Sequence, residues 1–484
     1  MTATTSVTSP ETSNPEPVRN EASAASVLVS RSSPAGPVDA GVAIKMPPAR
    51  PLPRLVQTGR FIFRTFGEGL TSRAELGDVW QLQLLGREPV IFTSHPEHVE
   101  SLFKAAPADA PSLTGESPLR PIVGPNSVLT AVGERHMRQR KLLLPSFHRE
   151  SVQRYTQQIA DVIEREINSW PAGQELTLAP RMQAVTLEVI MAGVFGVDGT
   201  PAPGSPEDRI YQTVQRLGKF STSWMWHIVE IAQLRRQEPT GPLRAAMSLI
   251  DRQLYAAIRA RRAEGTRACA TDVFSLLLET RDENGQPLSD QEIRDELLTL
   301  VLAGHETTAN SLAWTFERLL RTPDAYTRLR ELVRADDPAA DAYVEATIHE
   351  GMRTRPVIPI VIRMVKRPWR LGDYVVPAGT PVAISIVALH HREDIYPSPH
   401  SFMPERFLEQ PPGTYTWLPF GGGIRRCLGA TLAMAEQRVV LKAIARRTDL
   451  RAPTLIPEPP RQRNVTTIPR YGSRVIPEVI HPAG

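Results

Sequence analysis

The stretch FGGGIRRCLG, residues 420–429, carries the strongest chemical signal in this sequence. Three consecutive glycines make a poor helix, so we expect a loop whose backbone can pass close to a flat or bulky partner. An apolar segment with helical spacing, LGATLAMAEQRVVLKAIARR, follows and places Cys427 at the start of a helix. A helix N-terminus, nearby guanidinium groups and the N–H groups of the loop all favour a thiolate there. Cys427 is therefore a candidate metal ligand, and the alternative is a buried structural cysteine in a glycine-rich turn.

The longest helical pattern upstream of this loop covers residues 290–321. It opens with SDQE at residues 289–292, which fits a capping box, and it stops before the Thr-Pro pair at residues 322–323. At ~1.5 Å per residue, this helix is roughly 50 Å long, which is enough to cross a whole domain. We expect it to act as a scaffold for a functional element near its middle.

The middle of that helix carries the sequence AGHETT at residues 303–308. The small residues Ala303 and Gly304 would let a planar ligand approach the backbone, at a helix-propensity cost of ~1 kcal/mol for the glycine. Glu306 and Thr307 place an acid and a hydroxyl beside that gap. Taken alone, the same residues also fit a glycine-kinked core helix whose polar side chains hydrogen bond back to the backbone.

The rest of the sequence predicts a mainly α protein with a small β region. Apolar residues recur at helical spacing in residues 151–167, 242–262 and 430–446. Two short strands are expected within Asp78–Phe92, on either side of Gly86. Further strands are expected within Trp369–Val387, where Pro and Gly stand at a turn between β-branched runs.

The N-terminal segment has a different composition from the remainder. Residues 1–45 are rich in Ser, Thr, Ala, Pro and Glu, and they hold too little apolar surface to offset the entropy of ordering. We expect a disordered tail over residues 1–45, followed by a single folded domain over residues 46–484.

Composition and cysteine content narrow the class of protein. The formal net charge of the 484 residues is only +4, which gives no indication of nucleic-acid binding. Cys269 and Cys427 could form only one disulfide, so a reducing cytoplasm is the simpler interpretation, with Cys269 an ordinary thiol. No run approaches the ~18 apolar residues of a membrane span, and the N-terminus does not resemble a signal peptide. We expect a cytoplasmic monomer with no membrane span and no nucleic-acid partner.

Two further charged motifs have a spacing that places their residues on one face of a helix. His136 and Arg140, within GERHMRQR at residues 133–140, lie one helical turn apart and share a face. That arrangement suits the binding of a carboxylate by charge-assisted hydrogen bonds, although a generic basic surface helix would look the same. Glu350 and Arg353 also share a helical face, but such pairs are most often exposed pairs of small energy.

Together these segments resemble the cytochrome P450 superfamily. The spacing Phe-x-x-Gly-x-Arg-x-Cys-x-Gly at residues 420–429 is far more restrictive than its glycines alone. The other motifs precede it in the family's order, beginning with the short sheet near Asp78. The resemblance implies a helical prism with a small β region that encloses heme b (haem b, iron protoporphyrin IX). It also implies that the thiolate of Cys427 is the axial ligand of the iron.

The resemblance further implies roles for the residues around the haem. Cofactor contacts are implied for Ala303, Gly304, Phe420 and Gly421, and a propionate clamp for His136, Arg140, Arg363 and Arg425. Many family members carry Trp where His136 stands, and His is a familiar bacterial variant. Glu306 and Thr307 match the acid–alcohol pair that delivers protons during oxygen activation. A buried structural network is implied for Glu350, Arg353 and, from FMPERF at residues 402–407, Arg406.

The implied activity is that of a monooxygenase that inserts one oxygen atom of O2 into a C–H or C=C bond of an apolar small molecule. The sequence shows no flavin or iron–sulfur module, so electrons are expected from a separate ferredoxin or flavodoxin and its reductase. Arg135, Arg138 and Arg426 are expected to form a basic docking patch for an acidic ferredoxin. The alternatives are a haem-thiolate peroxygenase or isomerase that needs no external electrons, and a non-enzymatic haem gas sensor.

His305 and His349 each begin a zinc-protease-like His-Glu pattern, but the second ligand is replaced by Ala309 in one case and Arg353 in the other, which excludes a zinc hydrolase. The aromatic segment Phe220–His227 falls where the family's substrate lid lies. Fatty acid, terpenoid, steroid and polyketide substrates all remain open.

Overall fold

The computed structural model describes residues 34–39, 41–153, 155–197, 199, 201–221, 236–264, 272–281 and 285–482, except for the side chains of residues 149, 151, 217–221 and 264. The chain divides into two compact units, residues 1–32 and 33–484, and every described residue belongs to the second. Cys269 and most of the Phe220–His227 segment lie outside the described residues.

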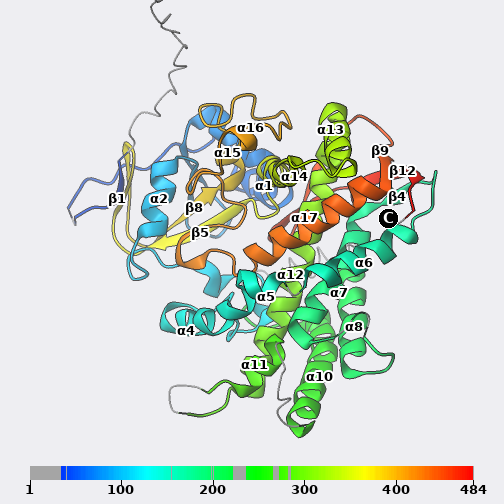
Figure 1. Cartoon of the computed structure of the whole chain (residues 1–484). Helices are drawn as coiled ribbons and strands as arrows, with labels where there is room; N and C mark the ends of the chain where they lie inside the picture. Colours follow the sequence, from blue (N-terminus) through cyan, green and yellow to red (C-terminus); the bar gives the residue numbers. More distant parts are fainter. Residues whose placement is uncertain are drawn as a thin grey trace, which may run out of the picture. The chain divides into compact units, whose positions relative to one another are not determined.

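Helices dominate the described residues (Figure 1). They are α1 (Arg54–Leu76), α2 (Pro96–Lys104), α3 (Arg120–Val123), α4 (Gly133–Leu143), α5 (Arg149–Gln153), α6 (Thr156–Asn168), α7 (Leu178–Phe195), α8 (Pro206–Ser221), α10 (Gly241–Glu264), α11 (Val273–Glu279), α12 (Asp290–Leu319), α13 (Pro323–Arg334), α14 (Ala340–Thr354), α15 (Ile386–His390), α16 (Arg406–Glu409) and α17 (Ala430–Arg447). Three 3-10 turns are η1 (Leu113–Glu116), η2 (Leu144–Phe147) and η3 (Gly423–Arg425).

The strands in the described part of the chain form four small sheets. They are β1 (Ala35–Pro37), β2 (Val79–Leu82), β3 (Val90–Thr93), β4 (Leu176–Thr177), β5 (Ile360–Val365), β6 (Trp369–Leu371), β7 (Tyr374–Val376), β8 (Thr380–Ser385), β9 (Thr448–Arg451), β10 (Pro460–Arg463), β11 (Thr466–Pro469) and β12 (Arg474–Ile480). The sheet orders are β2-β3-β8-β5, β1-β6-β7, β4-β12-β9 and the hairpin β10-β11. Pairing is antiparallel except between β3 and β8. The prediction of a mainly helical protein with a small β region is confirmed.

The predicted strands within Trp369–Val387 are β6, β7 and β8, but the last strand ends earlier than expected. Ser385 accepts a hydrogen bond from the backbone N–H of Ala388 and caps α15, so residues 386 and 387 are helical. The apolar run there is buried on all sides and has no period that separates strand from helix. The predicted strand boundary was therefore wrong.

Backbone pairing also begins before the boundary expected at residue 46. Strand β1 pairs with β6, and Lys45 forms an isolated bridge to Val375. Within residues 34–45, the described backbone is therefore attached to the sheet that β6 and β7 form.

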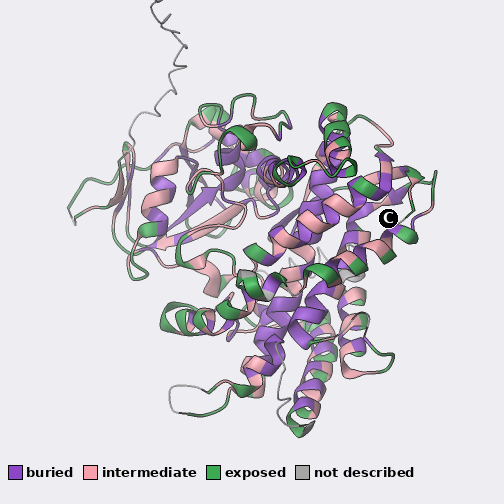
Figure 2. Ribbon diagram, viewed as in Figure 1, coloured by how far each residue is buried: buried purple, intermediate pink, exposed green. Residues whose placement is uncertain are grey.

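Helix α12 passes through the core and confirms the predicted long helix, although it ends at Leu319 rather than at residue 321. Its capping box is present, with the Ser289 hydroxyl accepting from the N–H of Glu292 and the Glu292 carboxylate accepting from the N–H of Ser289. Residues of α12 belong to two large apolar clusters, one shared with α6, α14 and α17 and the other with α10 and α11. Figure 2 shows that α12 and α7 are largely buried.

Helix α7 is, among the described residues, the one helix that is long and apolar enough to cross a membrane by length and composition. Most of it is buried within the fold, where it packs against α12. Its apolar sequence is accounted for by this contact. Gly304 allows the two helices to approach closely, because a Cβ atom there would lie 2.6 Å from Cδ1 of Ile190.

Candidate active site

The glycine loop that precedes α17 packs against the end of α2. A Cβ atom at Gly422 would overlap the ring of Phe103, and one at Gly423 would lie 2.7 Å from the carbonyl oxygen of Phe103. Gly421 and Gly423 both have φ of 63°, a conformation that side chains disfavour. The backbone N–H of Cys427 then donates to the carbonyl of Phe420 at 2.9 Å, which closes the loop. The glycines are thus required by the turn and by its close approach to α2.

Cys427 is exposed and lies just ahead of α17 rather than within it. The helix begins at Ala430, so the predicted position at a helix start was off by three residues. The surrounding protein desolvates the sulfur and raises the pKa of the thiol. A hydrogen bond from the backbone of Gly429 and the charges of Arg140 and Arg426 lower that pKa, but they do not outweigh desolvation. These groups act in the expected direction, toward the thiolate, and desolvation is the larger effect.

Four cationic or basic side chains lie close enough to interact with one another beside this loop. Burial and, in decreasing order, the charges of Arg425, Arg140 and Arg363 together lower the pKa of His136 to about 4. We call these four residues, His136, Arg140, Arg363 and Arg425, the cation cluster. They come from α4, β5 and the glycine loop, segments far apart in the sequence. The structure thus brings together all four residues expected to bind propionates.

The cation cluster has no carboxylate partner among the described residues. The guanidinium of Arg425 donates to the carbonyl oxygens of Val128, Leu129 and Ala131, and that of Arg140 donates to the carbonyl of Arg426 at 2.7 Å. Carbonyl oxygens satisfy hydrogen bonds but carry no full charge.

Arg363 shows most clearly that the cluster is uncompensated. It is only 6% exposed, and its described contacts are the neighbouring carbonyl of Ile362 and the ring of Phe103. Desolvation lowers the pKa of Arg363 to about 10, and that of Arg425 falls to about 10 as well, with the neighbouring arginines adding to desolvation. Buried positive charge without an anion is costly, so these residues fit a ligand that brings carboxylates.

One face of α12 is open in the middle of an otherwise buried helix. Residues 293–301 and 308–317 are all buried, whereas Ala303 is exposed and Thr307, one turn further on, is partly exposed. The Thr307 hydroxyl donates to the carbonyl of Ala303 at 2.7 Å, and the buried Thr308 bonds to the carbonyl of Gly304 in the same way. The apolar residues of α12 just before this open face, Leu297, Leu298, Leu300, Val301 and Leu302, belong to one apolar cluster with Leu428 and Leu432, which follow Cys427 in the chain.

Gly304 is partly exposed next to Ala303. Its missing side chain also leaves room for Ile190 of α7, as described above.

Glu306 belongs to a polar cluster that the sequence did not indicate. Its Oε1 atom lies 2.5 Å from Nη2 of Arg463 and accepts hydrogen bonds from Nε of Arg463 and the hydroxyl of Thr466, both at 3.1 Å. Both partners belong to the β10–β11 hairpin, about 160 positions further along the chain. The contact depends on the register of this hairpin, for which Glu306 itself carries no local signal.

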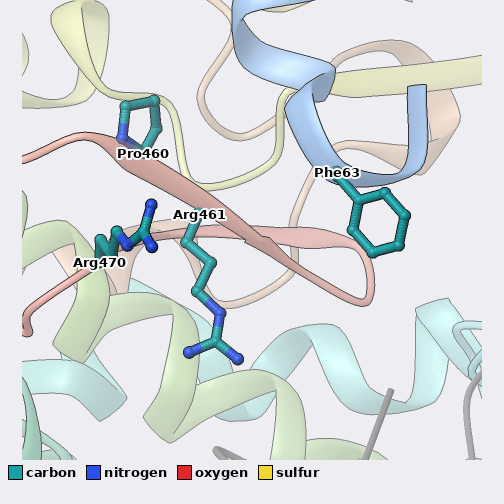
Figure 3. Close-up of a pocket in the computed structure, with 4 residues that line it drawn as sticks. All are labelled: Phe63, Pro460, Arg461 and Arg470. Atoms are coloured by element: carbon teal, nitrogen blue, oxygen red, sulfur yellow. The ribbon is translucent and has the colours of Figure 1, made fainter. Parts of the chain in front are cut away.

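The far end of the same hairpin reaches the protein surface. There Phe63 of α1, Pro460, Arg461 and Arg470 line a shallow pocket of about 300 Å³ (Figure 3). Arg461 is partly exposed and Arg470 is exposed, whereas Arg463 is buried and pairs with Glu306 of α12. The hairpin therefore presents one end to α12 and the other to the exterior.

The three residues expected to form a structural network are in direct contact. Both oxygens of Glu350 accept from Arg353, at 2.7 and 2.8 Å, and Arg406 donates to the same carboxylate at 3.2 Å. Glu350 and Arg353 are fully buried. Arg353 also donates to the carbonyls of His390, Pro399 and Ser401. We call Glu350, Arg353 and Arg406 the compensated network.

Within the expected docking patch, Arg138 and Arg426 are exposed, and Arg135 lies 3.2 Å from the carboxylate of Glu292 at the N-terminus of α12. Among the described residues, no group of three or more His, Cys, Asp or Glu side chains could hold a metal ion.

Comparisons with known proteins agree with this geometry. Residues 51–473 match the family model described as cytochrome P450. The chain is 36% identical to cytochrome P450 135A1 of Mycobacterium tuberculosis, over 90% of this chain and 96% of that protein. It is 33% identical to cytochrome P450 138 of Mycobacterium bovis, over 92% and 98% respectively.

Two solved structures share the fold. One is retinoic acid-bound cyanobacterial CYP120A1, with a TM-score of 0.73, 22% identity, and coverage of 90% of this chain and 99% of that one. The other is the cytochrome P450DA heme domain, with a TM-score of 0.76, 22% identity, and coverage of 91% and 99%.

Proposed function

The chain belongs to the cytochrome P450 family, and from this premise we propose that it is a monooxygenase that oxidises an apolar small molecule with Cys427 as the axial ligand of its haem. Family members bind haem through a cysteine thiolate, and Cys427 is the one cysteine among the described residues. The observation that carries the proposal is the cation cluster, whose buried Arg363 has no described carboxylate partner. Its charge supports a cofactor with acidic side chains.

Each part of the site has a distinct task under this proposal. Arg363 and Arg425, with Arg140 and the neutral imidazole of His136, hold the two propionates by charge-assisted hydrogen bonds. The close-packed glycine loop fixes the position of Cys427. The haem, when bound, supplies activation of O2, with two electrons and two protons consumed and one oxygen atom released as water.

The open face of α12 supplies the protons. Ala303 leaves room beside the helix, and the hydroxyl of Thr307 stands on the same face, where it can hold a water molecule or pass a proton. Glu306 is the neighbouring acid. General acid catalysis by positioned groups typically contributes ~10²–10⁴-fold to rate.

Replacing Cys427 with Ser tests the ligand assignment. The ferrous–CO spectrum of the wild-type protein should show the strongly red-shifted Soret band of a thiolate-ligated haem, and Cys427→Ser should lose it. An unchanged band in the variant would contradict the proposal, because another residue would then be the ligand.

Replacing Thr307 with Ala tests the proton route. The variant should keep consuming NAD(P)H while it releases hydrogen peroxide in place of product. Thr308→Ala is the matched control, since Thr308 is buried one residue further round the helix. The relay would be wrongly placed if Thr307→Ala stayed coupled or if Thr308→Ala uncoupled more.

The electron source separates this proposal from a peroxygenase. We propose a separate ferredoxin or flavodoxin that docks on the surface formed by Arg138 and Arg426, in the cytoplasm. The acid–alcohol pair Glu306 and Thr307 supports the monooxygenase, since a peroxide-driven enzyme has no need of it. Turnover with NAD(P)H and redox partners, but not with peroxide alone, is the expected result.

A screen for substrate-induced shifts of the haem spectrum would identify the substrate.

A further inference from the structure

We infer that Arg463, with Thr466, is a positioning residue that holds the Glu306 carboxylate in the orientation needed for proton delivery, so that the β10–β11 hairpin is part of the proton route. This inference rests on the proposed function. Its physical basis is the set of contacts between one carboxylate oxygen and two side chains of the hairpin.

The hairpin geometry directs both side chains to the same place. Arg463 and Thr466 are opposite each other in the antiparallel register, so they project from the same face. Asn464, with φ of 51°, and Val465 form the two-residue turn between them. The Thr466 hydroxyl also lies 2.9 Å from the carbonyl oxygen of Arg463, so its single proton is shared between that carbonyl and Glu306.

The hairpin is itself fixed to the core. The backbone N–H of Thr467 donates to the carbonyl of Val357 at 2.7 Å, and the carbonyl of Thr467 accepts from the indole of Trp314 at 3.0 Å. Arg463 is 5% exposed and Thr466 6% exposed. The anchor of Glu306 is therefore a rigid, largely dry element rather than a mobile surface arginine.

The two oxygens of Glu306 are in different situations. Oε1 takes every described contact, from Nε and Nη2 of Arg463 and from the hydroxyl of Thr466. Oε2 has no hydrogen-bond partner among the described residues, and the side chain is 28% exposed. With Oε1 saturated, the free lone pairs lie on Oε2, which makes Oε2 the atom that accepts a proton from solvent and passes it toward Thr307. Loss of the anchor would leave the carboxylate free to rotate out of that orientation.

Three variants of the holoenzyme test this role. Arg463→Gln removes the charge, Arg463→Lys keeps it, and Thr466→Val removes only the hydroxyl. Arg470→Gln is the matched control, because Arg470 lies beyond the far end of the hairpin in the exposed pocket (Figure 3). We expect Arg463→Gln to lower the amount of product formed per NAD(P)H by about 3- to 10-fold, with a matching rise in peroxide. This loss is smaller than the ~10²–10⁴-fold that a positioned general acid typically contributes to rate. Arg463→Lys should stay within about 2-fold of wild type, and Thr466→Val should fall between the two.

Two readouts separate positioning from general damage. Substrate affinity, measured from the haem spectral shift, should change by less than about 2-fold in Arg463→Gln. The solvent isotope effect on product formation should rise in that variant and not in Arg470→Gln, because proton transfer has become slower.

Thermal unfolding tests the contact independently of activity. Arg463→Gln should lower the Tm by about 1–3 °C in the wild-type background and by clearly less in Glu306→Gln, since the pair is already broken there. Equal shifts in both backgrounds would overturn the anchoring.

Coupled turnover in Arg463→Gln, together with uncoupling in Thr307→Ala, would overturn the inference and leave the proposed function intact. Coupled turnover in Thr307→Ala would instead contradict the proposed proton route, and the unfolding cycle would still decide whether Arg463 anchors Glu306.

Discussion

The cation cluster and the compensated network both place positive charge in the interior, and they differ in their counter-ions. In the compensated network, the carboxylate of Glu350 contacts both Arg353 and Arg406 and offsets one of the two positive charges. In the cation cluster, Arg363 contacts one carbonyl oxygen and an aromatic ring but no described carboxylate. We propose that the compensated network stabilises the fold and that the charge of the cation cluster is offset by the carboxylates of a ligand.

Removing the partner from the compensated network should have the largest effect on stability. Arg353→Met leaves the fully buried Glu350 carboxylate without its bidentate partner, and we expect a loss of about 3–5 kcal/mol in the free energy of unfolding. Urea denaturation of the holoprotein measures it. Arg328→Gln, which breaks an exposed pair with Glu405, is the control and should cost under about 1 kcal/mol. Equal losses of unfolding free energy in the two variants would contradict the distinction between the buried compensated network and an exposed ion pair.

The same substitution in the cation cluster should act on the cofactor instead. Arg363→Met removes a charge that has no carboxylate to leave behind, so the unfolding free energy of the apoprotein should not fall. Haem release should accelerate by about 10- to 100-fold, the equivalent of one lost charge-assisted hydrogen bond. Transfer of haem to apomyoglobin measures the rate. A strong loss of apoprotein stability with an unchanged rate of haem release would mean that Arg363 stabilises the fold and does not bind the cofactor.

A buried carboxyl group beside the cation cluster makes the stability of the fold depend on pH. Glu296 is 2% exposed and accepts a hydrogen bond from the N–H of Val128, the residue whose carbonyl binds Arg425. Desolvation raises the pKa of Glu296 to about 8. Because the folded state keeps this proton longer than the unfolded state does, Glu296 lowers stability as pH rises from about 4.5 to about 8.

Glu296→Gln should therefore be more stable than wild type at pH 8, by about 1–2 kcal/mol, and indistinguishable from it near pH 4. Chemical denaturation at the two pH values measures the difference. A variant that is less stable than wild type at pH 8 would mean that Glu296 is ionised and paired in the folded state.

The smallest effect is expected for exposed charge. Arg138→Glu should slow reduction by the redox partner a few-fold at low salt, and the loss should disappear at high salt, because exposed charges steer encounter and are screened. Stopped-flow reduction at two ionic strengths measures it. Arg135→Glu should act less on docking, since Arg135 is already paired with Glu292. A loss that persists at high salt would contradict steering.

Local signals in the sequence were sufficient to predict much of the fold. The capping box at Ser289 and Glu292 is formed within one turn of chain, so it could be predicted without any tertiary information. The strand boundary at Ser385 could not, because the apolar run that follows is buried on every side and leaves no periodic pattern.

The site was predictable only where residue types and spacing were distinctive. The glycine loop indicated Cys427, and the family resemblance supplied Arg363 and Arg425. Nothing in the sequence indicated Arg463, whose contact with Glu306 spans 157 positions and depends on a hairpin register. Nor did the sequence indicate that desolvation would raise the pKa of Cys427, since desolvation depends on how the whole fold packs around the thiol.

The central claim is that the uncompensated charge of the cation cluster binds the carboxylates of the haem. Titration of the apoprotein with haem and with its dimethyl ester, in which both propionates are blocked, tests it most directly. We predict at least ~10-fold weaker binding of the ester to the wild-type chain, from the loss of charge-assisted hydrogen bonds, and a smaller difference in Arg363→Met. Equal affinity of the wild-type chain for the two porphyrins would contradict the claim.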